Sequence, residues 1–147
     1  MSGTRRESDQ CSCDIAVDTR LGHAYNEEAF RYLLGVQSKR SQRSDRSFLL
    51  LLVDLKDQPG TDRRIDPPMA RKVFSGLWRA LREVDVVGWY REQRIAGAVL
   101  TEFGDRPVAD VTRLITQRVT EVLSQAVPAA ASRLQVRVCQ IQPRLKG

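Results

Sequence analysis

The pattern of apolar and polar positions predicts one central strand with amphipathic helices around it. Residues 48–53 are all apolar, and Leu55 follows after one acid, Asp54. A short apolar run without alternation and with polar ends is typical of a strand that is buried on both faces of a sheet. A membrane-spanning helix would need about 20 apolar residues, so this run predicts no membrane span. We therefore expect a central strand over residues 47–55, with Asp54 at its C-terminal end.

Three segments have the three- and four-residue spacing of amphipathic helices. They cover about residues 24–40, 66–81 and 105–126. The first has acids in its first turn and bases in its last, as the helix dipole favours. The second opens with Asp66-Pro67-Pro68, where Asp is a good N-cap and Pro is tolerated in the first turn.

The remaining apolar segments predict three further strands. Residues 84–90 and 95–100 read as an antiparallel pair around the polar break Arg91–Arg94, and residues 134–139 alternate between apolar and polar. The order is therefore helix, strand, helix, hairpin, helix, strand. This order predicts an α+β fold with a mostly antiparallel sheet, a hairpin at its centre and helices covering it.

Polar segments separate these elements. Residues 1–18 have few apolar anchors and are expected to be a flexible leader, followed by a single domain over residues 19–147. Residues 38–47 read as a polar, basic loop. The first ten residues lack the apolar segment of a secretory signal, so we expect a cytoplasmic location.

Charge and cysteine content limit the kinds of ligand and metal site that the sequence predicts. Lys and Arg number 24 against 18 Asp and Glu, in a chain of 147 residues. Nearly all of the excess is arginine, which suits planar recognition of phosphates and guanine edges. Cys11, Cys13 and Cys139 have no second Cys or His pair beside them, so no metal site is predicted. His23 is the single histidine, and we interpret it as structural.

Three motifs along this order resemble the diguanylate cyclase (GGDEF) domain, over roughly residues 18–142. The segment Asp18–Phe30 resembles the opening signature of the family, and Leu52-Val53-Asp54-Leu55-Lys56 resembles its first strand. Arg82-Glu83-Val84-Asp85 matches the Arg-x-x-Asp that precedes the family's hairpin. The resemblance implies a GGDEF-like, nucleotidyl-cyclase-like fold.

The departures from the family concern catalysis. The hairpin turn, which reads Gly-Gly-Asp/Glu-Glu-Phe in the family, here reads Arg91-Glu92-Gln93-Arg94-Ile95. The family's glycines let the backbone approach the nucleotide, and the following acid binds a divalent ion. Here Gln93 carries no charge, and Lys56 replaces the companion of Asp54. From these departures we expect a degenerate, catalytically inactive domain, not an enzyme, without catalytic residues, bound metal or cofactor.

The Arg-x-x-Asp motif predicts a ligand site instead. In the family this motif binds the product, cyclic di-GMP, at an inhibitory site outside the active site. An arginine can fork onto a guanine edge or a phosphate, and an acid can accept from the guanine amide and amine. The predicted ligand-binding residues are Arg82, Asp85 and, from the next long helix, Arg118. The alternative is that Arg82 and Asp85 form only a local ion pair at a helix end.

The sequence is compatible with three functions. The first is a signalling domain that acts as a cyclic di-GMP receptor through the Arg-x-x-Asp site. The second is a protein-interaction or scaffold module, with a protein partner or a homodimer, that uses the basic turn Arg91–Arg94 or an exposed face. The third is a basic nucleic-acid-binding domain, which no aromatic-rich sheet motif, helix-turn-helix glycine or zinc spacing supports.

Overall fold

The computed structural model describes residues 14–60, 62–81, 84–101 and 107–142. Within these ranges the chain forms the following strands and helices in order: β1 (Ile15–Asp18), β2 (His23–Tyr25), α2 (Glu27–Ser44), β3 (Phe48–Leu55), α3 (Pro67–Ala80), β4 (Val84–Arg91), β5 (Ile95–Leu100), α4 (Val108–Ala126), the short 3-10 helix η1 (Pro128–Ala130) and β6 (Leu134–Ile141). Cys11 and Cys13, Arg82 and Glu83 of the Arg-x-x-Asp motif, and the first residues of the helix expected from residue 105 lie outside the described residues.

The strands form one six-stranded sheet in the order β1-β2-β4-β5-β3-β6. β4 and β5 are a hairpin at its centre, and both neighbours of β3 run antiparallel to it. The pairing of β2 with β4 is parallel and rests on one residue pair, Tyr25 with Gly88. The predicted α+β fold with a mostly antiparallel sheet and a central hairpin is confirmed.

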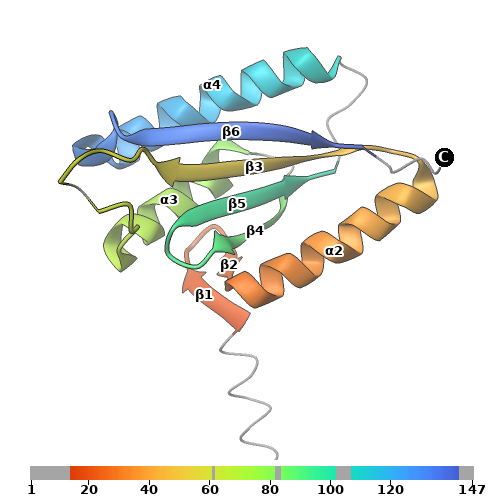
Figure 1. Ribbon diagram of the computed structural model, residues 1–147, viewed down its shortest axis with the longest axis horizontal. Coiled ribbons are helices and arrows are strands. Elements are labelled where there is room, and N and C mark those ends of the chain that lie inside the picture. The colour runs from red at the N-terminus through yellow and green to blue at the C-terminus, as the bar shows by residue number, and fades with distance from the viewer. Residues whose placement is uncertain (1–13, 61, 82–83, 102–106, 143–147) are drawn as a thin grey trace, which may run out of the picture.

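Helices cover both faces of the sheet (Figure 1). α3 and α4 pack on one face around a core that includes Leu49, Leu51, Val53 and Leu55 of β3. α2 packs on the other face, where a smaller core includes Phe30 together with alternate residues of β3. Because both faces are covered, all eight residues of β3 are buried. This explains the uninterrupted apolar run, and the prediction of a central buried strand is confirmed.

α2 is seated on the sheet by the Phe30 ring. Phe30 is completely buried, and it lies above Gly88 of β4 and Gly97 of β5, which are paired across the hairpin. A Cβ atom on Gly97 would lie 2.8 Å from Phe30 Cζ, and one on Gly88 would lie 3.0 Å from Phe30 Cδ1. Because neither glycine has a side chain, the sheet has a depression at this place, and the ring lies in it.

α3 begins as the sequence predicts. Asp66 is its N-cap and accepts a hydrogen bond from the Met69 backbone N–H at 3.0 Å, with Pro67 and Pro68 in the first turn. α3 lies close to α4 at Gly76, where a Cβ atom would come within 2.6 Å of a methyl carbon of Leu123. The apolar stripes of both helices are thus part of the core, as expected from their spacing.

The structure corrects the sequence analysis in the N-terminal third. α2 begins at Glu27, after the N-cap Asn26, and continues to Ser44, so the loop expected from residue 38 is helical over most of its length. β1 and β2 were not predicted, and β1 occupies residues 15–18 of the expected leader. These strands have only four and three residues, which is too short for an alternation of apolar and polar positions to be recognised.

Candidate functional site

The hairpin turn lies where the sequence places it, between β4 and β5. Arg94 N–H donates to the Arg91 carbonyl at 2.9 Å and closes the turn. Gln93 has a φ of 60°, in the left-handed region that glycine adopts most readily. The turn therefore keeps a backbone conformation suited to glycine, although a larger side chain occupies it.

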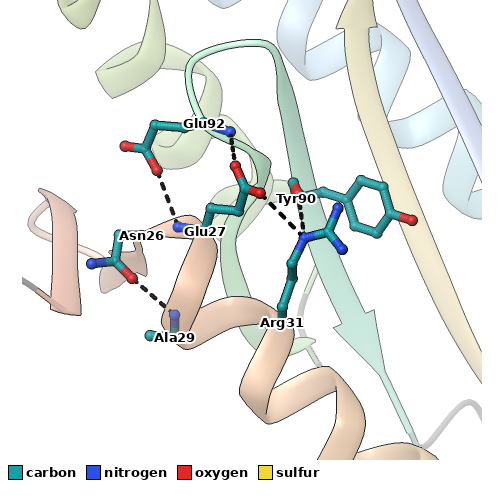
Figure 2. A network of polar contacts seen from close by, with 6 residues as sticks. All are labelled: Asn26, Glu27, Ala29, Arg31, Tyr90 and Glu92. Atoms are coloured by element: carbon teal, nitrogen blue, oxygen red, sulfur yellow. Dashed lines mark hydrogen bonds and ion pairs between the residues drawn. The ribbon is translucent and has the colours of Figure 1, made fainter.

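A reciprocal pair of hydrogen bonds joins this turn to the start of α2. The Glu92 backbone N–H donates to Glu27 Oε1 at 2.7 Å, and the Glu27 backbone N–H donates to Glu92 Oε1 at 3.1 Å. Figure 2 shows the two carboxylates crossing between the helix end and the turn. Each acid thus satisfies an N–H group of the other segment, and the Glu92 carboxylate also lies at the positive end of the α2 dipole. We call this pair the Glu27–Glu92 clasp.

Arg31 extends the contact between α2 and β4. Its Nε donates to the Tyr90 carbonyl at 3.2 Å and lies 3.4 Å from Glu27 Oε2. Its guanidinium also lies over the Tyr90 ring, 4.8 Å from the centroid, as a cation–π contact. Arg31 therefore orients Glu27 within the clasp (Figure 2).

The segment before α3 covers the turn from another side. Ile65 N–H donates to the Gln93 carbonyl at 2.8 Å, and Arg64 Nε donates to Gln93 Oε1 at 2.9 Å. The backbone and the side chain of Gln93 are thus both engaged by the protein itself. The turn is held by α2 on one side and by the segment before α3 on the other.

Replacing Glu27 by alanine tests the clasp. The Glu92 N–H would lose a charged acceptor, so we expect the free energy of unfolding in urea to fall by about 1–2 kcal/mol. Glu28→Ala is the matched control, because Glu28 is exposed in the same helical turn and makes no hydrogen bond or ion pair to the described residues. Equal losses in the two variants would show that the effect is only the charge at the helix end.

Asp54 lies at the end of β3 and is 5% exposed. Its Oδ2 lies 3.3 Å from Arg137 Nη2 and 3.6 Å from Arg63 Nη2, while Oδ1 is buried without a hydrogen-bond partner. Two guanidinium groups, each about half exposed, therefore surround the carboxylate that resembles a metal-binding acid. Lys56, two residues on, is exposed and its backbone N–H bonds to the Arg133 carbonyl.

Sequence reasoning missed both arginines. Gln135 of β6 lies opposite Asp54 of β3, and Arg137 is two positions further along β6. The Arg137 side chain is therefore on the same face of the sheet as Asp54 and reaches its carboxylate. Arg63 reaches it through the segment before α3. No spacing in the sequence connects residue 54 to residue 137, and only the register of the two strands makes them neighbours.

A pocket of about 650 Å³ lies beside the turn. Its walls come from β1, the first turns of α2 and α3, and the hairpin. Glu27, Glu28 and Glu92 line it together with Arg31, so its charged lining is mainly acidic. Trp89 and Ile65 add an apolar part. This lining suits cationic or neutral groups better than anionic ones.

The predicted ligand-binding residues are placed only in part. Asp85 is exposed in β4, and its Oδ2 accepts hydrogen bonds from the backbone N–H and the hydroxyl of Thr101, both at 2.8 Å. Arg118 is exposed on α4. Within the described residues no hydrogen bond or ion pair joins Asp85 to Arg118, and Arg82 is not among them. Among the described residues, the expected site is therefore represented by the Asp85 carboxylate, held by Thr101, and by the exposed Arg118 guanidinium, which lie on separate elements.

Other sequence expectations concern metals and membranes. In the part of the chain that the structure describes, no three His, Cys, Asp or Glu residues are grouped so that they could hold a metal ion. None of the described helices combines the length and the apolar character that a membrane crossing requires. His23 lies in β2, with its Nδ1 2.9 Å from Asp18 Oδ1 at the surface.

No family model matches this sequence, and no curated protein is similar to it. Solved structures are similar in fold. The GGDEF domain of FimX from Pseudomonas aeruginosa has a TM-score of 0.51 at 13% identity, covering 88% of this chain and 83% of that one. The coiled coil and GGDEF domain of DgcB from Caulobacter crescentus, in complex with c-di-GMP, has a TM-score of 0.53 at 13% identity, covering 95% and 75%.

A third structure bears on catalysis. The diguanylate cyclase SiaD from Pseudomonas aeruginosa, in complex with its activator SiaC, has a TM-score of 0.51 at 18% identity. The match covers 99% of this chain and 57% of that one. The expectation that this chain is not an enzyme is overturned by that likeness, because the same fold belongs to a protein described as a cyclase. What the comparisons establish is the architecture, and this chain has the fold of a GGDEF domain.

Proposed function

We propose that this protein is a domain of cyclic di-GMP signalling that binds cyclic di-GMP through Arg82, Asp85 and Arg118. The observation that carries the proposal is the way the Asp85 carboxylate is hydrogen-bonded. One oxygen of its exposed carboxylate is held by two hydrogen bonds from Thr101, and the other makes no hydrogen bond or ion pair to the described residues. A fixed carboxylate with a free oxygen can accept from the amide and amine of a guanine edge without losing much freedom on binding.

The surrounding charge supports the same ligand. Arg118 makes no hydrogen bond or ion pair to the described residues and is exposed, so it is available to fork onto a phosphate or a guanine edge. Arg79, in the last turn of α3, adds positive charge near the start of β4. The likeness in fold to a protein crystallised with c-di-GMP agrees with this ligand class.

The test is a thermal-shift titration of the full chain with cyclic di-GMP. A ligand that binds only the folded state stabilises it by about 2.7 kcal/mol at a concentration 100 times its Kd. For the wild type we expect a saturable rise in Tm. The variants Arg82→Ala, Asp85→Asn and Arg118→Ala should each bind cyclic di-GMP with an apparent affinity at least about tenfold weaker, a loss of about 1.4 kcal/mol. Asn keeps an acceptor for Thr101, so Asp85→Asn separates ligand contact from folding.

Arg113→Ala is the matched control for Arg118. It removes a guanidinium from the same helix, exposed and paired with Asp110, and should leave the titration unchanged. GTP serves as the comparison nucleotide. The absence of any shift with cyclic di-GMP, or an equal loss of affinity in the Arg113 and Arg118 variants, would refute the proposed site.

A second candidate is a protein-interaction module that uses the hairpin turn. The side chains of Arg91 and Arg94 are exposed and make no hydrogen bond or ion pair to the described residues, while the turn itself is held rigidly. Exposed cations on a turn whose backbone is held in place suit an acidic protein partner. A flat response to both nucleotides in the same titration would favour this second function over the first.

A further inference from the structure

β6 is the last strand of the sheet, and one of its two sides is unpaired among the described strands. All eight of its residues pair with β3, from Leu134 opposite Leu55 to Ile141 opposite Phe48, without a register shift. Figure 1 shows β6 along the outer border of the sheet, opposite the border formed by β1. A regular strand of this length presents a row of backbone donors and acceptors to a further strand.

The hydrogen-bonding pattern between β3 and β6 identifies which backbone N–H and C=O groups of β6 point away from the sheet. The Lys56 N–H donates to the Arg133 carbonyl at 2.7 Å, which makes residues 56 and 133 a hydrogen-bonded pair. In an antiparallel ladder such pairs alternate with pairs that are not bonded. The backbone groups that form hydrogen bonds with β3 are therefore those of residues 135, 137, 139 and 141. Residues 134, 136, 138 and 140 direct their N–H and C=O groups away from the sheet.

The two borders of the sheet differ in how they are protected. β1 is only four residues long and has a register shift between Ile15 and Val17. Short length and bulges are two ways in which proteins prevent an edge strand from pairing. β6 has neither, and it contains no proline and no lysine. Its charged residue, Arg137, belongs to the set that bonds towards β3, and its guanidinium is paired with Asp54.

We propose that β6 pairs with β6 of a second copy of this chain, antiparallel about a two-fold axis at Val138. In this register Val138 lies opposite its own counterpart, and Val136 of one copy lies opposite Gln140 of the other. All three positions direct their backbone groups outward, so each forms part of a hydrogen-bonded pair. The two sheets then become one continuous sheet, and neither copy keeps an open β6 edge.

Self-pairing is favoured because the strand is complementary to itself. The two-fold axis at Val138 places Arg137 opposite Cys139 of the other copy, so identical charges do not face each other directly. The axis at Val138 also pairs residues 135–141, seven of the eight residues of β6, whereas an axis at Val136 or Gln140 shortens the overlap. A closed, isologous contact of this kind stops at two copies.

Sedimentation equilibrium of the full chain over a range of concentrations, with a reductant present, tests the proposal. We expect the wild type to form dimers as concentration rises, and Val138→Pro to remain monomeric. Proline removes an N–H that the ladder with β3 does not use, so it blocks the edge and spares the sheet. Val138→Ala is the matched control, because it removes side-chain atoms but keeps the N–H, and it should still dimerise.

Gln140→Pro is a second edge variant, at an exposed position nearer the strand end, in case Val138→Pro does not fold. Hydrogen exchange of the wild type needs no substitution. The amides of Val136 and Val138 should exchange quickly in dilute solution and slow at least about tenfold as dimers form, while those of Arg137 and Cys139 stay protected throughout. A wild type that remains monomeric, or dimers that persist in both proline variants, would overturn the proposal.

Discussion

Replacing Phe30 by alanine is expected to lower the free energy of unfolding by about 3–5 kcal/mol, as for other fully buried aromatic side chains. The ring is the contact that seats α2 in the depression formed by Gly88 and Gly97. Without it, a cavity remains that glycine backbone cannot fill. The start of α2 would also lose its fixed position, so the Glu27–Glu92 clasp should weaken, and protection of the Glu92 amide from hydrogen exchange should fall.

Urea unfolding followed by circular dichroism gives the free energy for this test. Tyr32→Ala is the control, because Tyr32 lies on the same helix with 71% of its surface exposed, and we expect it to change stability by no more than about 0.5 kcal/mol. A double-mutant cycle adds a sharper criterion. The cost of Gly97→Ala should largely disappear in the Phe30→Ala background, because the added methyl group then meets no ring. Additive costs would contradict the proposed packing.

Gly88→Ala is expected to be the most damaging substitution of a glycine in the sheet. A Cβ atom there would lie 2.7 Å from the Tyr25 carbonyl oxygen and 3.0 Å from the Tyr25 nitrogen. These are backbone atoms of β2, which cannot rotate away as a side chain can. Because Tyr25 with Gly88 is the single pair that joins β2 to β4, we expect a loss of about 3 kcal/mol, the upper end of ordinary overpacking.

Gly35→Ala is the matched control for this second test. It adds the same methyl group to an exposed position of α2, where nothing lies within 4 Å. Helix propensity predicts a gain in stability of up to about 1 kcal/mol there. Thermal unfolding of both variants measures the contrast in sign. If Gly88→Ala retained the stability of the wild type, β2 would not lie as close to β4 as the structure places it.

Much of the fold follows from local pattern. The run of apolar residues in β3 predicts burial on both faces, and the spacing within α3 and α4 predicts the side that faces the core. The Asp66-Pro67-Pro68 start of α3 and the polar turn between β4 and β5 are also readable, because capping and turn formation depend on a few adjacent residues. These elements were placed nearly as the structure has them.

The candidate sites followed from sequence only where a motif is contiguous. Asp85 stands in such a motif, and the structure adds that Thr101 holds its carboxylate. The expectation that departures in the turn exclude an enzyme did not survive comparison, because a cyclase shares the fold. Fold and function are separate properties, because one fold carries different functions according to the residues of its sites.

The sequence by itself determined the order of the elements from α2 onwards, the burial of β3 and the class of the fold. Each of these depends on periodicity or on neighbours a few residues apart. The tertiary structure decided which distant residues meet: Arg137 with Asp54 across 83 positions, Glu27 with Glu92 across 65, and Phe30 with two glycines of the hairpin. Strand register and helix docking create these contacts, and both arise from the packing of the whole chain, which no local pattern contains.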